Sequence, residues 1–224
     1  AAVAAQPAWA ALGVRERARR LSAGLDAMGE DVDERAVLLV RENGKTLAES
    51  RGEVAGLADR LRVGLEYVDR LAEPQVLDAP TGRTYVNHRP YGVVLSIVPW
   101  NAPVNLAFSQ IFSALLTGNA VVVKPPETAP LTVIATVALF ARALPPGVLN
   151  VVTGLPSEIG DALTTHPDVR KIVFTGSIAS ARHIGANALQ SIKSLLLELG
   201  AMLRGGGVGV FDFALHTVQR TTRR

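Results

Sequence analysis

The alternation of short apolar runs with helix-length segments from Val93 onward restricts the fold more than any other feature. Runs without polar alternation are typical of strands buried on both faces. Strand–helix alternation at this spacing predicts βαβ units and parallel strands. We therefore predict an α/β fold whose core, residues 93–200, is a doubly wound, Rossmann-like parallel sheet. The expected strands are 93–98, 120–123, 148–152, 172–175 and 195–199, and the expected helices are 103–117, 131–144, 157–165 and 178–189.

The residues before this core predict helices followed by an extended arm. Residues 1–79 are expected to be helical, with helices over 8–29, 32–43 and 47–72, the first supported by apolar residues that share one helical face. Asp31 with Glu34, and Thr46 with Glu49, have the spacing of capping boxes, and a helix is expected to end at Gly44. Residues 80–92 contain a strand-like segment between prolines and are read as an arm.

The composition excludes several classes of protein. The chain has 224 residues, 48% of them hydrophobic, which suffices for a buried core and rules out a disordered chain. It has no cysteine, so thiol nucleophiles, disulfide scaffolds and cysteine-ligated metals are excluded. The four histidines are dispersed without ligand spacing, and we predict no metal site.

The net charge of +3 comes from the last 24 residues, where Asp212 is the sole acidic residue beside four arginines. Scattered arginines without aromatic neighbours do not predict a nucleic-acid partner. No apolar run reaches the roughly 18 residues of a membrane span, and no signal peptide is recognisable, so we expect a cytoplasmic protein without a membrane partner. The chain starts at Ala1 rather than Met, which suggests processing or a fragment.

Ligands of doubly wound sheets bind at the carboxyl ends of the strands, so the residues after each strand are the candidates. Asn101, in a turn between two prolines, offers an amide donor that can stabilise an oxyanion. It could equally satisfy its own backbone. Lys124 and Glu127 have the spacing to bind two ribose hydroxyls, although the spacing alone favours an ordinary exposed ion pair.

Two further strand ends carry candidates. Gly176 and Ser177 lie where a strand turns into a helix, a place where the backbone can approach a pyrophosphate, but a glycine–serine pair at a turn is common. Glu198 ends the last apolar run and could act as a general base. The alternative is a strand-end carboxylate that points to water.

Considered together and in this order, the motifs resemble those of the aldehyde dehydrogenase superfamily over about residues 8–200. The pieces that carry the resemblance are Glu42-Asn43-Gly44-Lys45, Pro99-Trp100-Asn101-Ala102-Pro103, Lys124-Pro125-Pro126-Glu127, Pro146–Val152, Phe174-Thr175-Gly176-Ser177 and Glu198-Leu199-Gly200. Each is modest alone, but their joint order and spacing are specific.

The resemblance implies an NAD(P)-dependent oxidation of an aldehyde to a carboxylic acid. By this resemblance Asn101 donates to the oxyanion of the thiohemiacetal, and Glu198 activates the water that hydrolyses the thioester. Lys124 and Glu127 hold the adenosine ribose, and Glu127 favours NAD over NADP because a carboxylate repels a 2′-phosphate. Gly160 and Ser177 lie near the adenine and the pyrophosphate. The implied cofactor-binding set is Val98, Pro99, Trp100, Asn101, Lys124, Glu127, Gly160, Phe174, Thr175, Gly176, Ser177 and Leu199.

The sequence also departs from the family pattern. The family nucleophile is a cysteine in a later domain, so we expect that the catalytic domain is absent and that this chain is inactive alone. Ala201 replaces a second glycine after Glu198-Leu199-Gly200, while Pro156 and Ala181 replace glycines and put the pyrophosphate contact in doubt. The pattern is lost over 201–224, which we interpret as a frameshift or truncated reading frame. A divergent natural C-terminus is the alternative.

The main alternative function is a non-catalytic nucleotide-binding or oligomer-interface module. The segment near residues 83–92 resembles part of the family's oligomerisation arm, which implies a homo-oligomer for the full-length form. A misfolded product is a third interpretation, because loss of a catalytic domain would expose the apolar surface that it covers.

Overall fold

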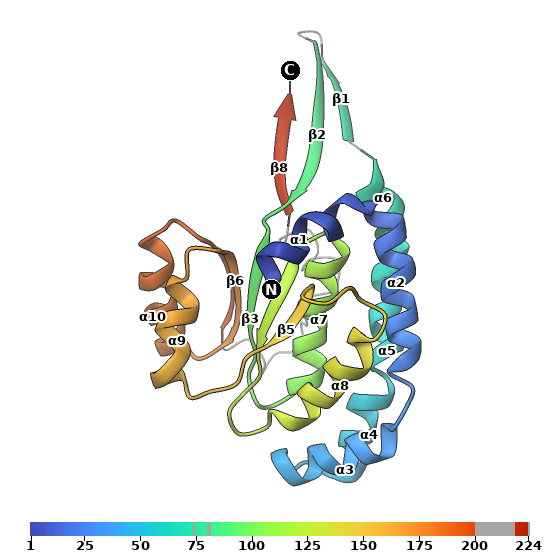
Figure 1. Cartoon of the computed structure of the whole chain (residues 1–224), viewed down its shortest axis with the longest axis vertical. Helices are drawn as coiled ribbons and strands as arrows, with labels where there is room; N and C mark the ends of the chain where they lie inside the picture. Colours follow the sequence, from blue (N-terminus) through green and yellow to red (C-terminus); the bar gives the residue numbers. More distant parts are fainter. Residues whose placement is uncertain (74, 80–81, 200–217, 224) are drawn as a thin grey trace.

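The computed structural model describes residues 1–73, 75–79, 82–199 and 218–223. Its centre is a five-stranded parallel sheet in the order β5-β4-β3-β6-β7, which confirms the predicted doubly wound fold (Figure 1). The first strand of the sheet, β3, lies at its centre. β4 and β5 follow on one side of β3, and β6 and β7 then follow on the other. The strands are β3 (Val93–Ile97), β4 (Ala120–Lys124), β5 (Leu149–Val151), β6 (Val169–Gly176) and β7 (Ser194–Leu199).

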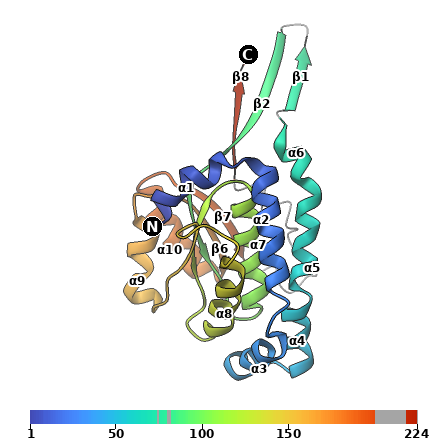
Figure 2. The same ribbon diagram turned by 45° about the vertical axis from the view of Figure 1, so that its right-hand side comes forward.

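Helices cover both faces of the sheet. On one face α7 (Pro103–Leu116) packs on β3 and β4, and α8 (Leu131–Ala141) packs on β5. On the other face α9 (Pro156–Thr165) and α10 (Ile178–Leu189) pack on β6 and on each other (Figures 1 and 2). Two clusters of buried apolar side chains fill these layers, the larger one on the α7 and α8 face.

The N-terminal helices are α1 (Ala2–Ala11), α2 (Gly13–Ala27), α3 (Val32–Asn43), α4 (Leu47–Ala55), α5 (Leu57–Arg62), a 3₁₀ turn (Val63–Tyr67) and α6 (Val68–Ala72). Of these, α2 to α5 pack outside α7 and α8, whereas α1 packs on β4 and β3. The prediction of a single helix over 8–29 is wrong. The chain turns at Leu12 and Gly13 and forms two helices, α1 and α2, and the φ of Gly13 is +72°. The helix predicted over 47–72 is likewise divided, at Gly56 and at the 3₁₀ turn.

The predicted helix ends have different outcomes. The Thr46–Glu49 capping box is present, with the Thr46 hydroxyl accepting from the Glu49 backbone and the Glu49 carboxylate accepting from the Thr46 N–H. Gly44 ends α3 with a φ of +78°, as predicted. The Asp31–Glu34 box is wrong. Asp31 itself adopts a φ of +49°, and its side chain makes no capping hydrogen bond to α3.

An antiparallel hairpin projects from the body of the molecule (Figures 1 and 2). Its strands are β1 (Gln75–Ala79) and β2 (Gly82–Pro90). The prediction that residues 1–79 are helical is therefore wrong for 75–79, which form a strand. The last helix of this region ends at Ala72, before the helix-breaking Pro74. A third strand, β8 (Val218–Arg223), pairs with the other edge of β2.

Most of the predicted tail 201–224 lies outside the described residues. The exception is β8, where no strand was predicted. The segment Glu198–Ala201 is described as far as Leu199. In the described parts of the chain, no helix combines the length and the apolar character needed to cross a bilayer.

One cation in this sheet is buried without an acidic partner among the described residues. Lys171, on β6, is 2% exposed. Its Nζ donates to the Ser194 hydroxyl at 2.9 Å and lies 5.0 Å from the centroid of the Tyr91 ring. Within the described ranges no carboxylate is within ion-pair distance of this ammonium. Burial lowers the pKa of Lys171 from 10.5 to about 8.

This lysine makes a testable contribution to pH-dependent stability. Between pH 8 and pH 10.5 the unfolded chain holds more protons at this position than the folded chain, so the free energy of unfolding rises with pH there. Across that window we expect the free energy of unfolding of the wild type to rise by on the order of 3 kcal/mol relative to that of Lys171→Met, at about 1.4 kcal/mol per pKa unit. Urea unfolding of both proteins at pH 7 and pH 10 measures this, and an unchanged difference between them would refute it.

Candidate functional site

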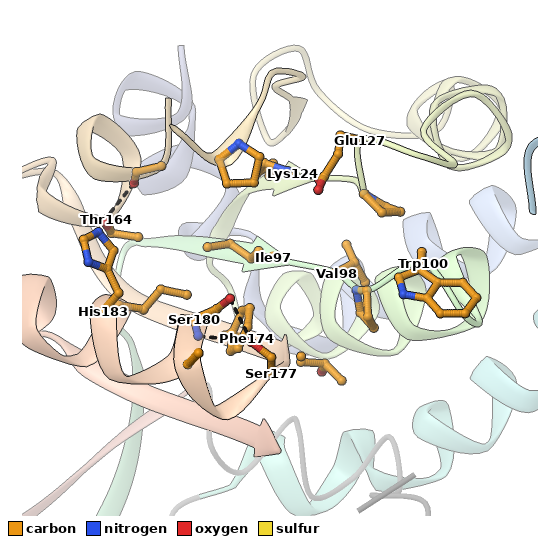
Figure 3. A pocket seen from close by; sticks show the side chains of 18 of the residues that line it. Ile97, Val98, Trp100, Lys124, Glu127, Thr164, Phe174, Ser177, Ser180 and His183 are labelled. Atoms are coloured by element: carbon orange, nitrogen blue, oxygen red, sulfur yellow. Dashed lines mark hydrogen bonds and ion pairs between the residues drawn. The ribbon is translucent and has the colours of Figure 1, made fainter. Parts of the chain in front are cut away.

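A pocket of about 1000 Å³ opens at the carboxyl ends of β3, β4 and β6. β3 is the first strand of the sheet, with β4 on one side and β6 on the other. The helices after β4 and β6 therefore depart to opposite faces and leave a crevice between them. Lys124 and Glu127 lie on one side of the pocket, Ser177 and Ser180 on the opposite side, and Ile97 and Val98 between them (Figure 3).

The turn after β3 forms the end of the pocket beside Trp100. Val98, Pro99, Trp100 and Asn101 all line the cavity. The Val98 N–H donates to the Lys124 carbonyl at 3.3 Å, which continues the sheet pairing into the turn. Trp100 is 61% exposed although it is a large aromatic side chain. Asn101 comes two residues before the start of α7 and lines the pocket.

The end of β4 and the segment after it supply a buried ammonium beside a carboxylate. The Lys124 side chain is 5% exposed, and its Nζ donates to the Pro125 carbonyl and to Glu127 Oε2, both at 3.2 Å. The Glu127 side chain is 42% exposed at the cavity. Burial acts to raise the pKa of Glu127, but a backbone hydrogen bond and Lys124 outweigh it and hold that pKa below its usual value. Because Lys124 is buried, this pair differs from the exposed ion pair that the spacing alone favoured.

The opposite side of the pocket is built by the turn from β6 into α10. The Ser177 hydroxyl caps α10 by accepting from the Ser180 N–H at 3.1 Å. The first turn of α10, Ile178–Ala181, carries no charge, so the positive end of the helix dipole is not neutralised by its own side chains. At Gly176 a Cβ would lie 2.5 Å from the Phe174 ring, so this turn has room for glycine only.

Glu198 and Leu199 separate at the end of β7. Glu198 is half-buried and lines the pocket. Leu199 is not among the lining residues; it packs against the apolar cluster under α10. The other members of the sequence-derived set all line the pocket, including Gly160, Phe174 and Thr175.

Apart from Gly160, sequence reasoning missed the lining residues that α9 and α10 contribute. His183 lines the pocket, and its Nε2 lies 2.6 Å from Asp161 Oδ1 on α9. Asn187 donates to the same oxygen at 2.8 Å and to the Thr164 hydroxyl at 2.9 Å, which ties the two helices together. The His183 and Asn187 hydrogen bonds lower the pKa of Asp161. The missed lining residues are Ile97, Pro126, Thr128, Pro156, Ser157, Thr164, Ala179, Ser180, His183 and Ile184.

The two departures noted in the sequence lie at different places. Pro156 starts α9 and lines the pocket, whereas Ala181 is buried in the cluster under α10. Within residues 1–73, 75–79 and 82–199, no group of three or more histidine, aspartate and glutamate side chains is placed to hold a metal ion.

A doubly wound parallel sheet with a pocket at the carboxyl ends of its central strands defines the Rossmann-like class of α/β proteins. Comparison with known proteins narrows the class. The model of the aldehyde dehydrogenase family matches residues 1–203. The chain therefore belongs to the aldehyde dehydrogenase family.

Curated relatives agree with this assignment. The chain is 40% identical over 202 residues to a glutarate-semialdehyde dehydrogenase of Pseudomonas aeruginosa, a match that covers 89% of this chain and 42% of that protein. It is 37% identical over 194 residues to a D-glyceraldehyde dehydrogenase (NADP⁺) of Picrophilus torridus, covering 86% of this chain and 39% of that protein. The chain thus matches about two-fifths of the length of these relatives.

Solved structures show the same fold. Lactaldehyde dehydrogenase from Escherichia coli superposes with a TM-score of 0.84 at 35% identity, covering 89% of this chain and 42% of that one. NADP-dependent glyceraldehyde-3-phosphate dehydrogenase from Bacillus halodurans, solved with NADP, gives a TM-score of 0.83 at 36% identity, covering 89% and 43%.

Proposed function

We propose that this chain binds NAD, or alternatively NADP, in the pocket between α9, α10 and the segment after β4. The observation that carries the proposal is the pairing of a buried Lys124 ammonium and an accessible Glu127 carboxylate on one side with the start of α10 on the other. A carboxylate and an ammonium can accept from and donate to vicinal hydroxyls. The uncharged start of a helix attracts a pyrophosphate.

The residues present fit such a cofactor. A cavity of about 1000 Å³ is of the size that cofactor sites require. At Gly160 a Cβ would meet nothing within 4 Å, so glycine leaves that part of the cavity open. We further propose that Glu127 disfavours NADP, because its carboxylate would repel a 2′-phosphate.

We propose that the complete enzyme to which this segment corresponds oxidises an aldehyde to a carboxylic acid. When bound, the cofactor would supply a hydride acceptor. Asn101 would donate its amide N–H to the developing oxyanion of the substrate. Glu198 would take a proton from the water that releases the acid. The chain holds no cysteine to supply the covalent step, and we expect no turnover from it alone.

The experiment is a titration of the 224-residue chain with NADH, followed by tryptophan fluorescence. Trp100 lines the pocket, whereas Trp9 is buried and donates from its Nε1 to the Leu115 carbonyl at 2.9 Å. We expect saturable quenching that a Trp100→Phe variant loses, and an NADH-dependent rise in melting temperature that this variant keeps. With NAD and an aldehyde we expect no NADH formation. Absence of both quenching and thermal stabilisation would overturn the binding proposal.

A second candidate role is an oligomer-interface module, favoured by the projecting hairpin. Val76, Leu77 and Tyr85 on this hairpin are exposed large apolar side chains. Such a surface is suited to association with a second subunit. Co-purification with a full-length relative would support this role, and NADH binding would not be required for it.

A further inference from the structure

The segment Glu42–Lys45, which ends α3, lies outside the pocket lining, yet three of its side chains hold the segments that frame the pocket. Glu42 reaches the start of α8, and Asn43 reaches Trp100. Lys45 reaches the carboxylate of Glu53 on α4, which in turn contacts the start of α7. α3 and α4 lie at the end of the molecule opposite the projecting hairpin, beside the loops that leave the carboxyl edge of the sheet (Figure 1).

Glu42 caps α8. Its Oε2 accepts from the Thr132 N–H at 2.8 Å and from the Thr132 hydroxyl at 2.6 Å, and its Oε1 accepts from the Leu131 N–H. The residue before α8 is Pro130, whose side chain cannot accept a hydrogen bond. Two of the N–H groups at the start of this helix are therefore satisfied by α3. Glu127 lies just before this helix start.

Glu53, on α4, performs the same task for α7. Its Oε1 accepts from the Val104 N–H at 3.0 Å and the Asn105 N–H at 3.1 Å. Ala102 precedes α7 and has no side-chain acceptor. The Glu53 side chain is 7% exposed, and Lys45 neutralises it through an ion pair to its other oxygen. A buried carboxylate that lacked this cation would be costly.

Asn43 completes the contact with the turn after β3. Its Nδ2 donates to the Trp100 carbonyl. Gly44 follows with a left-handed φ of +78°, which turns the chain so that Asn43 and Lys45 serve different segments. The turn that carries Trp100 and Asn101 is thus held at Trp100 by Asn43 and at the start of α7 by Glu53.

We propose that Glu42, Asn43, Lys45 and Glu53 form a brace that positions two loops of the nucleotide pocket, the loop between β3 and α7 and the loop between β4 and α8. They are positioning residues, since none of them lines the cavity. Glu42 fixes the adenosine side through α8. Asn43, with Lys45 and Glu53, fixes the end of the pocket beside Trp100, through the Trp100 carbonyl and the start of α7. The proposal rests on the proposed NAD(P) binding for its affinity readout, but the immobilisation of Trp100 can be measured without any ligand.

The test compares NADH and AMP affinities, because AMP lacks the nicotinamide half. We expect Glu42→Ala to weaken both about tenfold, as loss of hydrogen bonds to a charged group allows. Asn43→Ala should weaken NADH binding about tenfold and leave the affinity for AMP unchanged. Glu42→Gln keeps an acceptor and should restore part of the affinity. Glu30→Ala is the matched control, since Glu30 pairs with Arg142 at the far end of α8, at 2.6 Å; it should bind both ligands as the wild type does.

A second readout needs no nucleotide. Acrylamide quenches the exposed Trp100 in preference to the buried Trp9, and Asn43→Ala should raise the quenching of Trp100 while Glu30→Ala does not. If the wild type fails to bind NADH, the proposed function fails and this readout still tests the brace. If the wild type binds and the Glu42 and Asn43 variants match Glu30→Ala in both readouts, the brace is refuted.

Discussion

Replacing Lys124 by Met should weaken NADH binding between about tenfold and a hundredfold while leaving the free energy of unfolding within about 1 kcal/mol of wild type. The binding loss follows from removal of a charged donor at the cofactor pocket. The fold survives because the partner carboxylate, Glu127, is 42% exposed and can be solvated by water. NADH titration and urea unfolding measure the two effects separately.

Lys171→Met is the matched control for this variant. Lys171 is also a buried lysine of the same sheet, at the end of β6 away from the pocket. Its loss should leave NADH affinity unchanged. Equal affinities for the two variants and the wild type would contradict the role proposed for Lys124, and equal losses would indicate a general effect of altering the sheet.

Phe140→Ala should cost about 3–5 kcal/mol of folding free energy, the usual range for deleting a buried phenylalanine. Phe140 is fully buried on α8 and meets the Phe108 ring edge to face, with centroids 5.4 Å apart. α2 lies so close that a Cβ at Gly24 would sit 2.7 Å from the Phe140 ring. This ring therefore joins the N-terminal helices to the layer that covers the sheet. Urea unfolding at equilibrium measures the loss.

A double-mutant cycle with Gly24→Ala sharpens this prediction. In the wild type the added methyl overlaps the ring and should destabilise the protein. In the Phe140→Ala background the ring is gone, the methyl fills part of the cavity, and alanine favours the helix, so the same change should be neutral or stabilising. Additive effects of the two substitutions would show that these sites are not in contact.

The sheet was predictable because its strands are local signals. Each is an apolar run closed by glycine, proline or a polar residue, and Val93–Ile97 and Ala120–Lys124 lie within a residue of their predicted bounds. The strand over 75–79 was not recognised, because it was assigned to the helical region although it pairs with the adjoining β2. β8 was not recognised, because its partner β2 is far away in the sequence. Asp31 adopts a positive φ, a conformation that aspartate tolerates but that its presence in a sequence does not predict.

The residues of the site also fall into two groups, those that local sequence signals predicted and those that depend on contacts between distant segments. Lys124 and Gly176 end their strands and Glu127 follows one, and parallel strands end at one edge, so topology alone brought these residues together. His183 lies within a helix, and whether it reaches the pocket depends on how α10 packs against α9. Glu42 and Asn43 belonged to a recognised motif, but their partners, Thr132 and Trp100, are far away in the sequence, so only the folded structure reveals their contacts.

The pairing of β8 with β2 has a consequence for folding during synthesis. β1 and β2 adjoin in the sequence and can form their hairpin as soon as both have left the ribosome. β8 joins Arg223 to Tyr85, so a large part of the chain must be made before the outer edge of β2 gains its partner. Until then that edge presents unpaired N–H and C=O groups. Before Val218–Arg223 is made, the hairpin can therefore pair with a strand from another molecule, and β8 then occupies that edge.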